Sequence, residues 1–280
     1  MSKIEQALKK AEKHRRSEAP ANNCEKDKQA EQLIPSVSKL PSRSSHGGDI
    51  LLETEPLVVQ NEMLVSLLKE KSIVAEEYDK LRSTIIALTQ GEKFYNTLLV
   101  TSCASEEGKS LTALNLAISL AREQDHTVLL VDTDLRRPSL HRYLGIEPEV
   151  GLVHCLRDGL PLEKAMIKTG LGKLVILPAG EALRDPLDLI SSKQMRGIIM
   201  ELKERYAERY VIFDTPPALP FADAGVLAGM VDALLFVVRE GKARREDIQR
   251  TLEDFKAHKL LGVVFNDAKS LVKAQSYYYY

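Results

Sequence analysis

Short apolar runs alternate with longer stretches of helical periodicity from Leu64 to the end of the chain. The apolar runs predict strands at 97–101, 127–132, 174–178, 210–213, 232–238 and 260–265. The periodic stretches predict helices over 64–88, 109–123, 191–207, 221–229 and 245–257. Runs such as VLLVD and YVIFD are apolar on both faces, which is typical of a parallel sheet with helices on both sides. The pattern therefore predicts an α/β fold with a mostly parallel sheet.

The first 60 residues lack this alternation. Apolar residues recur at helical spacing from Ile4 to Ala11 and the opposite face is basic, so a short amphipathic helix is allowed there. Such a helix could dock on a partner or an acidic membrane surface, or it could be a solvated tail. The stretch 17–50 is rich in Ser, Pro, Lys, Glu and Asn, which is typical of a linker. We expect a flexible extension, one domain and a flexible tail, over 1–60, 61–272 and 273–280 respectively.

The composition is balanced in charge, with 39 Lys and Arg against 40 Asp and Glu among 280 residues. A dedicated nucleic-acid-binding protein would show a basic excess, so we expect no nucleic-acid partner. The sequence contains no run of about 18 apolar residues and no apolar core of a secretory signal. Cys24, Cys103 and Cys155 are widely spaced and odd in number, which favours a reducing compartment. These features together predict a cytoplasmic protein.

The segment VTSCASEEGKSLTALNLA predicts a phosphate-binding loop between a strand and a helix. It approximates the pattern G-x-x-x-x-G-K-[ST], with Cys103 in place of the first glycine. Backbone N–H groups at the helix N-terminus would hold phosphates, Lys109 would neutralise the β/γ oxygens, and Ser110 would ligate a metal ion. The alternative is an ordinary helix start, where acidic residues are favoured. The expected nucleotide contacts in the loop are Ser105, Glu106, Glu107, Gly108, Lys109, Ser110 and Leu111.

Carboxylates follow two of the predicted strands. Asp132 and Asp134 come at the end of VLLVDTD, and they point to one face if that strand continues; Asp214 ends YVIFD. Parallel strands present their carboxyl ends at one edge of the sheet, where ligands bind, so these residues should meet Lys109. The alternatives are a cap on the next helix for the first two residues and a turn starter for Asp214. Asn266 could contact adenine or occupy a turn.

Four consecutive phenols occupy Tyr277 to Tyr280, whereas aromatic residues are sparse elsewhere. The alternative to a functional cluster is an adventitious, sticky tail. A phosphoryl donor site and a cluster of phenolic acceptors in one polypeptide point to an enzyme that phosphorylates itself.

These motifs together resemble the bacterial tyrosine autokinases of exopolysaccharide and capsule synthesis, which are cytoplasmic P-loop enzymes related to septum-site and plasmid-partition ATPases. The resemblance covers roughly residues 74–280 and rests on SEEGKSLTALNLA, VLLVDTDLRRP, VIFDTPP, LPAGEALRDPLDLISS and the tyrosine cluster. The combination of DLRRP with the tyrosine tail is the most specific part, because partition ATPases lack both features. The resemblance implies a P-loop NTPase-like sheet.

The resemblance also implies roles for individual residues. Lys109 and Ser110 would serve the phosphates of ATP and Mg²⁺, with Asp134 and Asp214 organising the metal ion. Asp132 would accept the phenolic proton. The four acceptors, Tyr277, Tyr278, Tyr279 and Tyr280, would be modified in trans by a neighbouring subunit. Because several phosphates on one terminus would repel one another, we expect a homo-oligomer when the chain is unphosphorylated.

The partners implied are a separate membrane-embedded modulator of polysaccharide chain length, which would recruit the chain to the inner face of the membrane, and a cognate tyrosine phosphatase.

The chain departs from the family pattern in two places. A glycine is usual where this chain has Glu106, and a side chain there is expected to narrow the phosphate nest or to force a strained backbone angle. The family's Glu-x-x-Arg-x-x-Arg helix, used in ring assembly, is matched by Glu76, Asp79 and Arg82, so the middle arginine is missing.

Two other functions compete with the autokinase. The first is a positioning or partition ATPase that acts as a nucleotide-dependent switch. The second is a catalytically weak scaffold for the export machinery, which the loop carboxylate makes conceivable.

Overall fold

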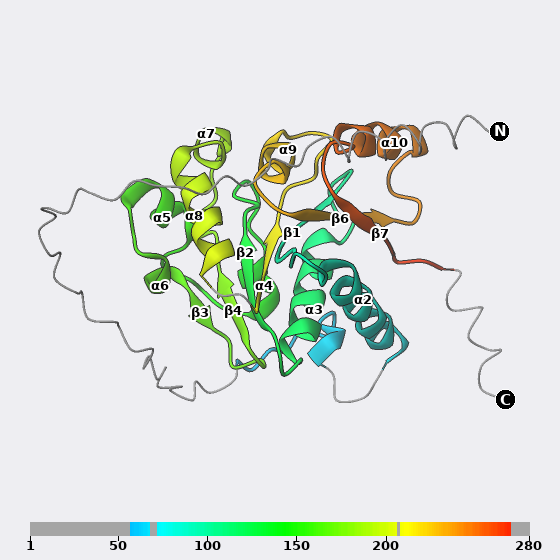
Figure 1. Ribbon diagram of the computed structural model, residues 1–280, viewed down its shortest axis with the longest axis horizontal. Helices are drawn as coiled ribbons and strands as arrows, with labels where there is room; N and C mark the ends of the chain where they lie inside the picture. The colour runs from blue at the N-terminus through cyan, green and yellow to red at the C-terminus, as the bar shows by residue number, and fades with distance from the viewer. Residues whose placement is uncertain (1–56, 68–71, 206–207, 270–280) are drawn as a thin grey trace, which may run out of the picture. The chain divides into compact units, whose positions relative to one another are not determined.

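The computed structural model describes residues 57–67, 72–205 and 208–269, all of which belong to the unit Ile50–Tyr280 (Figure 1). Most of the expected N-terminal extension and the whole tyrosine cluster lie outside these residues. None of the helices in the described part of the chain is long and apolar enough to cross a membrane.

Seven strands form one sheet, in the order β3-β4-β2-β5-β1-β6-β7. Every neighbouring pair is parallel except β3 and β4, which are antiparallel, so the predicted mostly parallel sheet is confirmed. Six of the strands lie where the apolar runs predict them, and the two-residue β3 was not predicted. The strands are β1 Thr97–Ser102, β2 Thr127–Asp132, β3 Ile167–Lys168, β4 Leu174–Leu177, β5 Arg209–Asp214, β6 Ala233–Arg239 and β7 Leu260–Asn266.

The helices confirm most of the periodic stretches. The predicted helix over 64–88 is instead a short 3-10 turn, η1, followed by the separate helix α2. Four short helices, α4 to α7, were not predicted, because four to seven residues carry too little periodicity to be recognised. The bounds are η1 Val65–Leu67, α2 Ile73–Thr89, α3 Lys109–Ala121, α4 Leu140–Leu144, α5 Leu152–Asp158, α6 Leu162–Ala165, α7 Leu187–Ile190, α8 Lys193–Glu204, α9 Asp223–Ala228 and α10 Arg245–Asp254.

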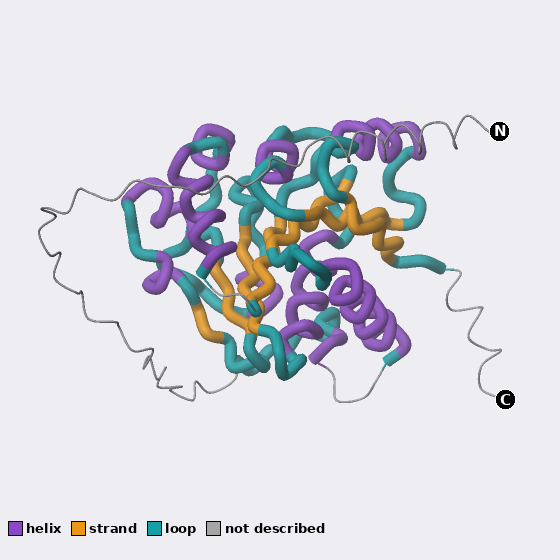
Figure 2. The backbone as a smooth tube through the Cα atoms, viewed as in Figure 1, coloured by secondary structure: helices purple, strands orange, loops and turns teal. Residues whose placement is uncertain are grey.

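Helices cover both faces of the sheet, as Figures 1 and 2 show. One buried cluster joins Leu99, Val131 and Phe213 of the strands to α5 through α10. The other joins alternate strand residues, such as Val100 and Ile212, to η1, α2, α3 and α4. Because successive strand side chains point to opposite faces, a run apolar at every position can fill both clusters. This arrangement explains why the central strands are buried along almost their whole length.

Helix α2 is tied to α3 by Arg82. Its guanidinium pairs with Asp79 within α2 at 3.0 Å and with Glu123 just beyond α3 at 3.0 Å. The same group donates to the Ser119 hydroxyl at 3.2 Å. In this chain, the last residue of the stretch that matches the ring-assembly motif therefore serves an internal contact between two helices.

The central strands β2, β5 and β1 bring their carboxyl ends together. Asp132 lies directly opposite Asp214 in the β2–β5 register. Thr133, just after β2, donates to the carbonyl of Asp214 from both its backbone N–H, at 2.8 Å, and its hydroxyl, at 2.6 Å. The loop that follows β1 opens on the same edge, so three strand ends define one site.

Candidate active site

The loop between β1 and α3 has the shape of a phosphate nest. Gly108 immediately precedes α3 and has a φ of 89°. The backbone angle favours glycine, and a Cβ at this position would come within 2.1 Å of the Asn266 amide nitrogen and displace that side chain. The free N–H groups of the first turn of α3 lie at this edge of the sheet and favour an anion.

Glu106 and Glu107 have different surroundings, although the sequence places both beside the phosphates. Glu106 has a φ of 64°, so the expected strained backbone angle is present. Its side chain is 77% exposed and pairs with Lys242 at 2.7 Å. That hydrogen bond is the main reason why the pKa of Glu106 lies below its usual value. The carboxylate is thus turned toward solvent and screened by a lysine.

Glu107 is completely buried. Its carboxylate accepts a hydrogen bond from the backbone N–H of Ala104 at 2.6 Å, and so braces the loop from within. Burial raises the pKa of Glu107 above its usual range. Any contact of this residue with a nucleotide would come from its backbone.

The ends of β6 and β7 hold the loop from outside. Asn266 donates from its side-chain amide to the carbonyl of Glu107 at 2.9 Å. Arg239 donates to the carbonyl of Glu106 at 3.3 Å and also pairs with Asp267 at 2.8 Å. The amide nitrogen of Asn266 is thus engaged with the loop, and the contact between Asn266 and adenine stays a prediction. Sequence reasoning missed Arg239 and Lys242, because nothing in their local sequence shows a partner more than 130 residues away.

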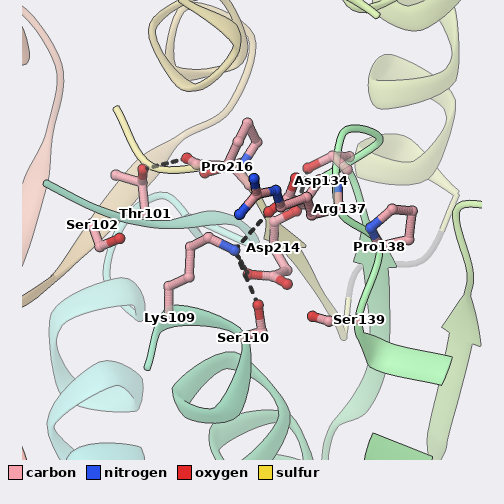
Figure 3. A network of polar contacts seen from close by, with 12 residues as sticks. Thr101, Ser102, Lys109, Ser110, Asp134, Arg137, Pro138, Ser139, Asp214 and Pro216 are labelled. Carbon is pink, nitrogen blue, oxygen red and sulfur yellow. Dashed lines mark hydrogen bonds and ion pairs between the residues drawn. The ribbon is translucent and has the colours of Figure 1, made fainter. Parts of the chain in front are cut away.

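Lys109 is the central cation of the site (Figure 3). Its ammonium nitrogen lies 2.8 Å from an oxygen of Asp134 and 3.8 Å from one of Asp214. It also donates to the Ser110 hydroxyl at 3.1 Å. Burial alone would lower the pKa of Lys109, but the attraction of Asp214 and Asp134 outweighs it and the pKa is raised. The predicted meeting of the phosphate loop with the strand-end carboxylates is present in the structure.

The burial of Asp214 is only partly compensated, by the Lys109 ammonium 3.8 Å from one of its oxygens. Its side chain is fully buried, and neither carboxylate oxygen has a hydrogen-bond partner among the described residues. Burial is the main cause that raises the pKa of Asp214 to about 6, and the charge of Lys109 opposes it. A buried carboxylate without hydrogen bonds is costly unless a cation or a proton neutralises it.

The donor set at this edge suits Mg²⁺. Carboxylate and hydroxyl oxygens are its preferred ligands, and it usually keeps several waters and binds through only one or two carboxylates and substrate phosphates. Consistent with this, no three His, Cys, Asp or Glu side chains in the described part of the chain come together closely enough to hold a metal ion by themselves. The unpartnered oxygens of Asp214 are the observation that fits a cation.

The carboxylate of Asp132 accepts hydrogen bonds from three backbone N–H groups, one of them that of Asp134 at 3.2 Å. Strand β2 ends at this residue, so the condition for Asp132 and Asp134 to share a face of one strand is not met. One oxygen of Asp132 accepts from the backbone N–H groups of Ser139 and Leu140, at 3.1 and 3.2 Å, at the start of α4. Burial, followed by the charge of Asp214, raises the pKa of Asp132 to about 8. The carboxyl is therefore both a cap and a group that can hold a proton near neutral pH.

The two arginines of DLRRP differ in role. Arg136 pairs with the buried Asp223 at 3.1 Å and lies over the ring of Phe221, 4.4 Å from its centroid. It therefore fixes the loop onto the chain around α9. Arg137 is exposed, and its backbone N–H donates to Asp134 at 3.1 Å. Figure 3 shows Arg137 beside the carboxylates that surround Lys109.

Comparison with known proteins places this geometry in a family. The model of the CobQ/CobB/MinD/ParA nucleotide binding domain matches residues 98–277. Tyrosine-protein kinase YwqD of Bacillus subtilis (strain 168) is 35% identical over 219 residues, which cover 78% of this chain and 90% of that protein. Tyrosine-protein kinase CpsD of Streptococcus pneumoniae serotype 4 (strain ATCC BAA-334 / TIGR4) is 32% identical over 198 residues, 69% of this chain and 84% of that protein.

Among solved structures, the chimerical protein CapA2B2 aligns with a TM-score of 0.68 and 27% identity, covering 76% of this chain and 94% of that one. The chain belongs to the CobQ/CobB/MinD/ParA nucleotide-binding family and, within it, to the bacterial tyrosine-protein kinases. The predicted P-loop NTPase-like fold class is confirmed.

The incompletely compensated burial of Asp214 predicts a pH-dependent stability. Because its folded-state pKa of about 6 lies above that of an unfolded Asp, the folded chain binds the extra proton between these values. The free energy of unfolding should therefore fall as pH rises through this window. Asp214→Asn removes this cost. We expect it to be more stable than the parent by about 1–3 kcal/mol above about pH 7, with the difference shrinking toward about pH 4.

Urea unfolding without Mg²⁺ across this pH range measures the difference. The matched control is Asp125→Asn, at an exposed carboxylate, which should show no such pH trend. An Asp214→Asn chain that is less stable than the parent at the alkaline end would contradict the assignment of Asp214 as a buried charge that Lys109 compensates only in part.

The backbone of Glu106 predicts a second effect on stability. Glu106→Gly relieves the left-handed strain and should raise the melting temperature by about 2–4 °C. Glu106→Ala loses the same carboxylate but keeps the Cβ, so it should show no gain. Calorimetric melting of the two variants separates strain from charge, and equal melting temperatures would show that the angle is not strained.

Proposed function

We propose that this chain is an ATP-dependent protein-tyrosine autokinase that regulates exopolysaccharide or capsule polymerisation and export. The observation that carries the proposal is Lys109 at the mouth of a phosphate nest, flanked by Asp134 and Asp214. Its relatives YwqD and CpsD are named tyrosine-protein kinases. A nucleotide-switched positioning ATPase would need the same nest, but it would not need a cluster of terminal tyrosines.

In this proposal the loop 105–111 binds the phosphates of ATP. The backbone N–H groups at the start of α3 donate to phosphate oxygens, and Lys109 exchanges part of its contact with Asp134 for the β/γ oxygens. The loop keeps its shape because Glu107 and Asn266 brace it from behind. Preorganised donors of this kind stabilise the charge that develops in the transition state.

Ser110, Asp134 and Asp214 would hold Mg²⁺. When bound, the ion neutralises the β/γ-phosphate oxygens and aligns them for transfer. Asp214 offers two oxygens that are free of hydrogen bonds within the described residues, and Asp134 is the partner of Lys109. Both carboxylates therefore lie where a divalent cation would relieve their mutual repulsion.

The acceptors would be Tyr277 to Tyr280 of a neighbouring copy. The phenol oxygen forms a bond to the γ-phosphorus, the bond to the β–γ bridging oxygen breaks, and the phenolic proton passes to the carboxylate of Asp132. A pKa near neutrality suits a group that takes a proton during the reaction. Adjacent tyrosines cannot all enter one site together, so they would be modified one after another.

Outside the active site, we propose a membrane-embedded chain-length modulator as the partner that recruits the chain to the inner face of the membrane. We also propose a tyrosine phosphatase that resets the tail. Both of these proposed partners rest on the membership of this chain in the tyrosine-kinase family.

Removal of the central cation tests the donor site. Lys109→Met should lower autophosphorylation at least about a thousandfold, because it removes a charge that contacts the transferred phosphoryl group. Labelling with γ-phosphate-labelled ATP measures the loss, and circular dichroism with Mg²⁺ present checks the fold. The exposed Lys256 gives the control Lys256→Met, which should label like the parent. Equal labelling of both variants would refute the site.

Phosphorylation of the tail should release subunits from each other. Each phosphate adds about −1.5 to −2 charges, so several on one terminus repel the acidic strand ends and one another. Light scattering after size exclusion should give a larger mass for the Lys109→Met chain than for the phosphorylated parent. A parent chain with Tyr277 to Tyr280 all changed to Phe should stay associated in ATP. Identical masses for all forms would contradict release by phosphorylation.

A further inference from the structure

A cavity of about 490 Å³ opens beside the catalytic edge of the sheet. One wall is formed by Arg137, Pro138, His141 and Arg142, from the end of DLRRP into α4, and the other by residues 180–182. Its volume is in the range of pockets that hold a small ligand or a large side chain. Neither the nucleotide site nor the proposed metal ligands line it.

The charge of this cavity is positive. Arg137 and Arg142 are both exposed. The Arg137 side chain makes no hydrogen bond or ion pair with any described residue, and Arg142 donates only to the carbonyl of Pro138, at 3.0 Å. The single carboxylate in the lining, Glu181, is paired with Arg157 outside the cavity. Two guanidinium groups therefore line a space whose own lining contains no unpaired carboxylate.

His141 adds a polar group rather than a charge. Burial and the nearby Arg142 lower the pKa of His141, so the imidazole is neutral at neutral pH and offers a hydrogen bond. Pro138 and Ala182 add apolar residues to the lining. An aromatic ring that carries an anionic group would match both parts of this lining.

Part of the cavity lining follows the strand-end carboxylates directly in the sequence. The same short segment carries Asp134, whose carboxylate holds the backbone N–H of Arg137 at 3.1 Å, and Asp132, which caps the start of α4. A polypeptide that places one side chain near Asp132 can therefore reach the cavity with a side chain only a few residues away, since an extended chain advances about 3.3 Å per residue.

We propose that this cavity, lined by Arg137, His141 and Arg142, binds a phosphotyrosine side chain from the tyrosine tail of a second copy of this chain. Arginine pairs with phosphate through two parallel N–H···O bonds, which gives strength and direction. We take the tail as the occupant because, in this sequence, only residues 277–280 place several phenols next to one another. Once one tyrosine carries phosphate, the cavity holds it while a neighbouring tyrosine enters the active site. Release of the subunits follows only when several phosphates on one tail repel the acidic strand ends and one another.

This inference takes its source of phosphotyrosine from the proposed autokinase function, but binding itself needs no ATP. The proposed kinase activity and the proposed phosphotyrosine site can therefore be refuted separately. A chain that does not label in ATP but binds a phosphorylated tail peptide would refute the kinase and keep the cavity, whereas the reverse outcome would remove the cavity alone.

The test measures the binding of synthetic peptides of residues 274–280 to the dephosphorylated full chain. Fluorescence anisotropy in the absence of nucleotide gives the affinity. The peptide phosphorylated on Tyr279 should bind at least about tenfold more tightly than the unmodified peptide, because charge-assisted hydrogen bonds to phosphate are added. It should also bind more tightly than a peptide phosphorylated on Ser276 instead. Its affinity should fall as salt is raised.

Two variants and one matched control locate the site. Arg142→Gln and Arg137→Gln should each weaken binding of the phosphotyrosine peptide by about tenfold. Arg250→Gln removes the same charge from exposed helix α10, on the β6–β7 side of the sheet, and should leave binding unchanged.

Three results would overturn the proposal. The first is equal affinity for the phosphorylated and unmodified peptides. The second is unchanged binding in both cavity variants. The third is a competition result. If millimolar inorganic phosphate displaces the labelled peptide as well as the same concentration of unlabelled phosphotyrosine peptide does, the site binds phosphate alone.

Discussion

The contact of one partly buried lysine with two buried carboxylates is the constraint around which the site is built. Lys109 supplies a single positive charge, whereas Asp134 and Asp214 supply two negative charges and Asp132 lies close by. Charges out of water are tolerated only when they are paired, and here the pairing is incomplete. Burial is the main cause of the raised pKa values of Asp132 and Asp214, and the single lysine does not offset it. A bound divalent cation would supply the missing positive charge.

The fold places these groups and keeps them there. Three adjacent parallel strands end at one edge, and the hydrogen bonds of Thr133 to the Asp214 carbonyl lock two of those ends together. The phosphate loop would be free to change shape if it were held only by its termini. Glu107 from inside and Asn266 from the sheet edge restrict it, so the donors face the ligand before it arrives. Stability and catalytic preorganisation thus depend on the same contacts.

The sequence predicted the parts of this site that are local. VLLVD, YVIFD and the GKS run each specify a strand end or a helix start, and their meeting follows from the geometry of parallel sheets. Helices α4 to α7 escaped prediction because segments so short are stabilised by tertiary packing rather than by periodicity. The pair between Glu106 and Lys242 and the cap formed by Asp132 also escaped it. These contacts depend on loops that only the folded chain brings together.

The most direct test of the central claim is calorimetry of the magnesium complex of a non-hydrolysable ATP analogue at about pH 6.5, in two buffers of different ionisation enthalpy. If the carboxylates are short of positive charge, the cation should displace protons from them. The parent's binding heat should then differ between buffers by more than that of the Asp214→Asn chain. Equal buffer dependence in the two chains, or binding that does not need Mg²⁺, would contradict the account.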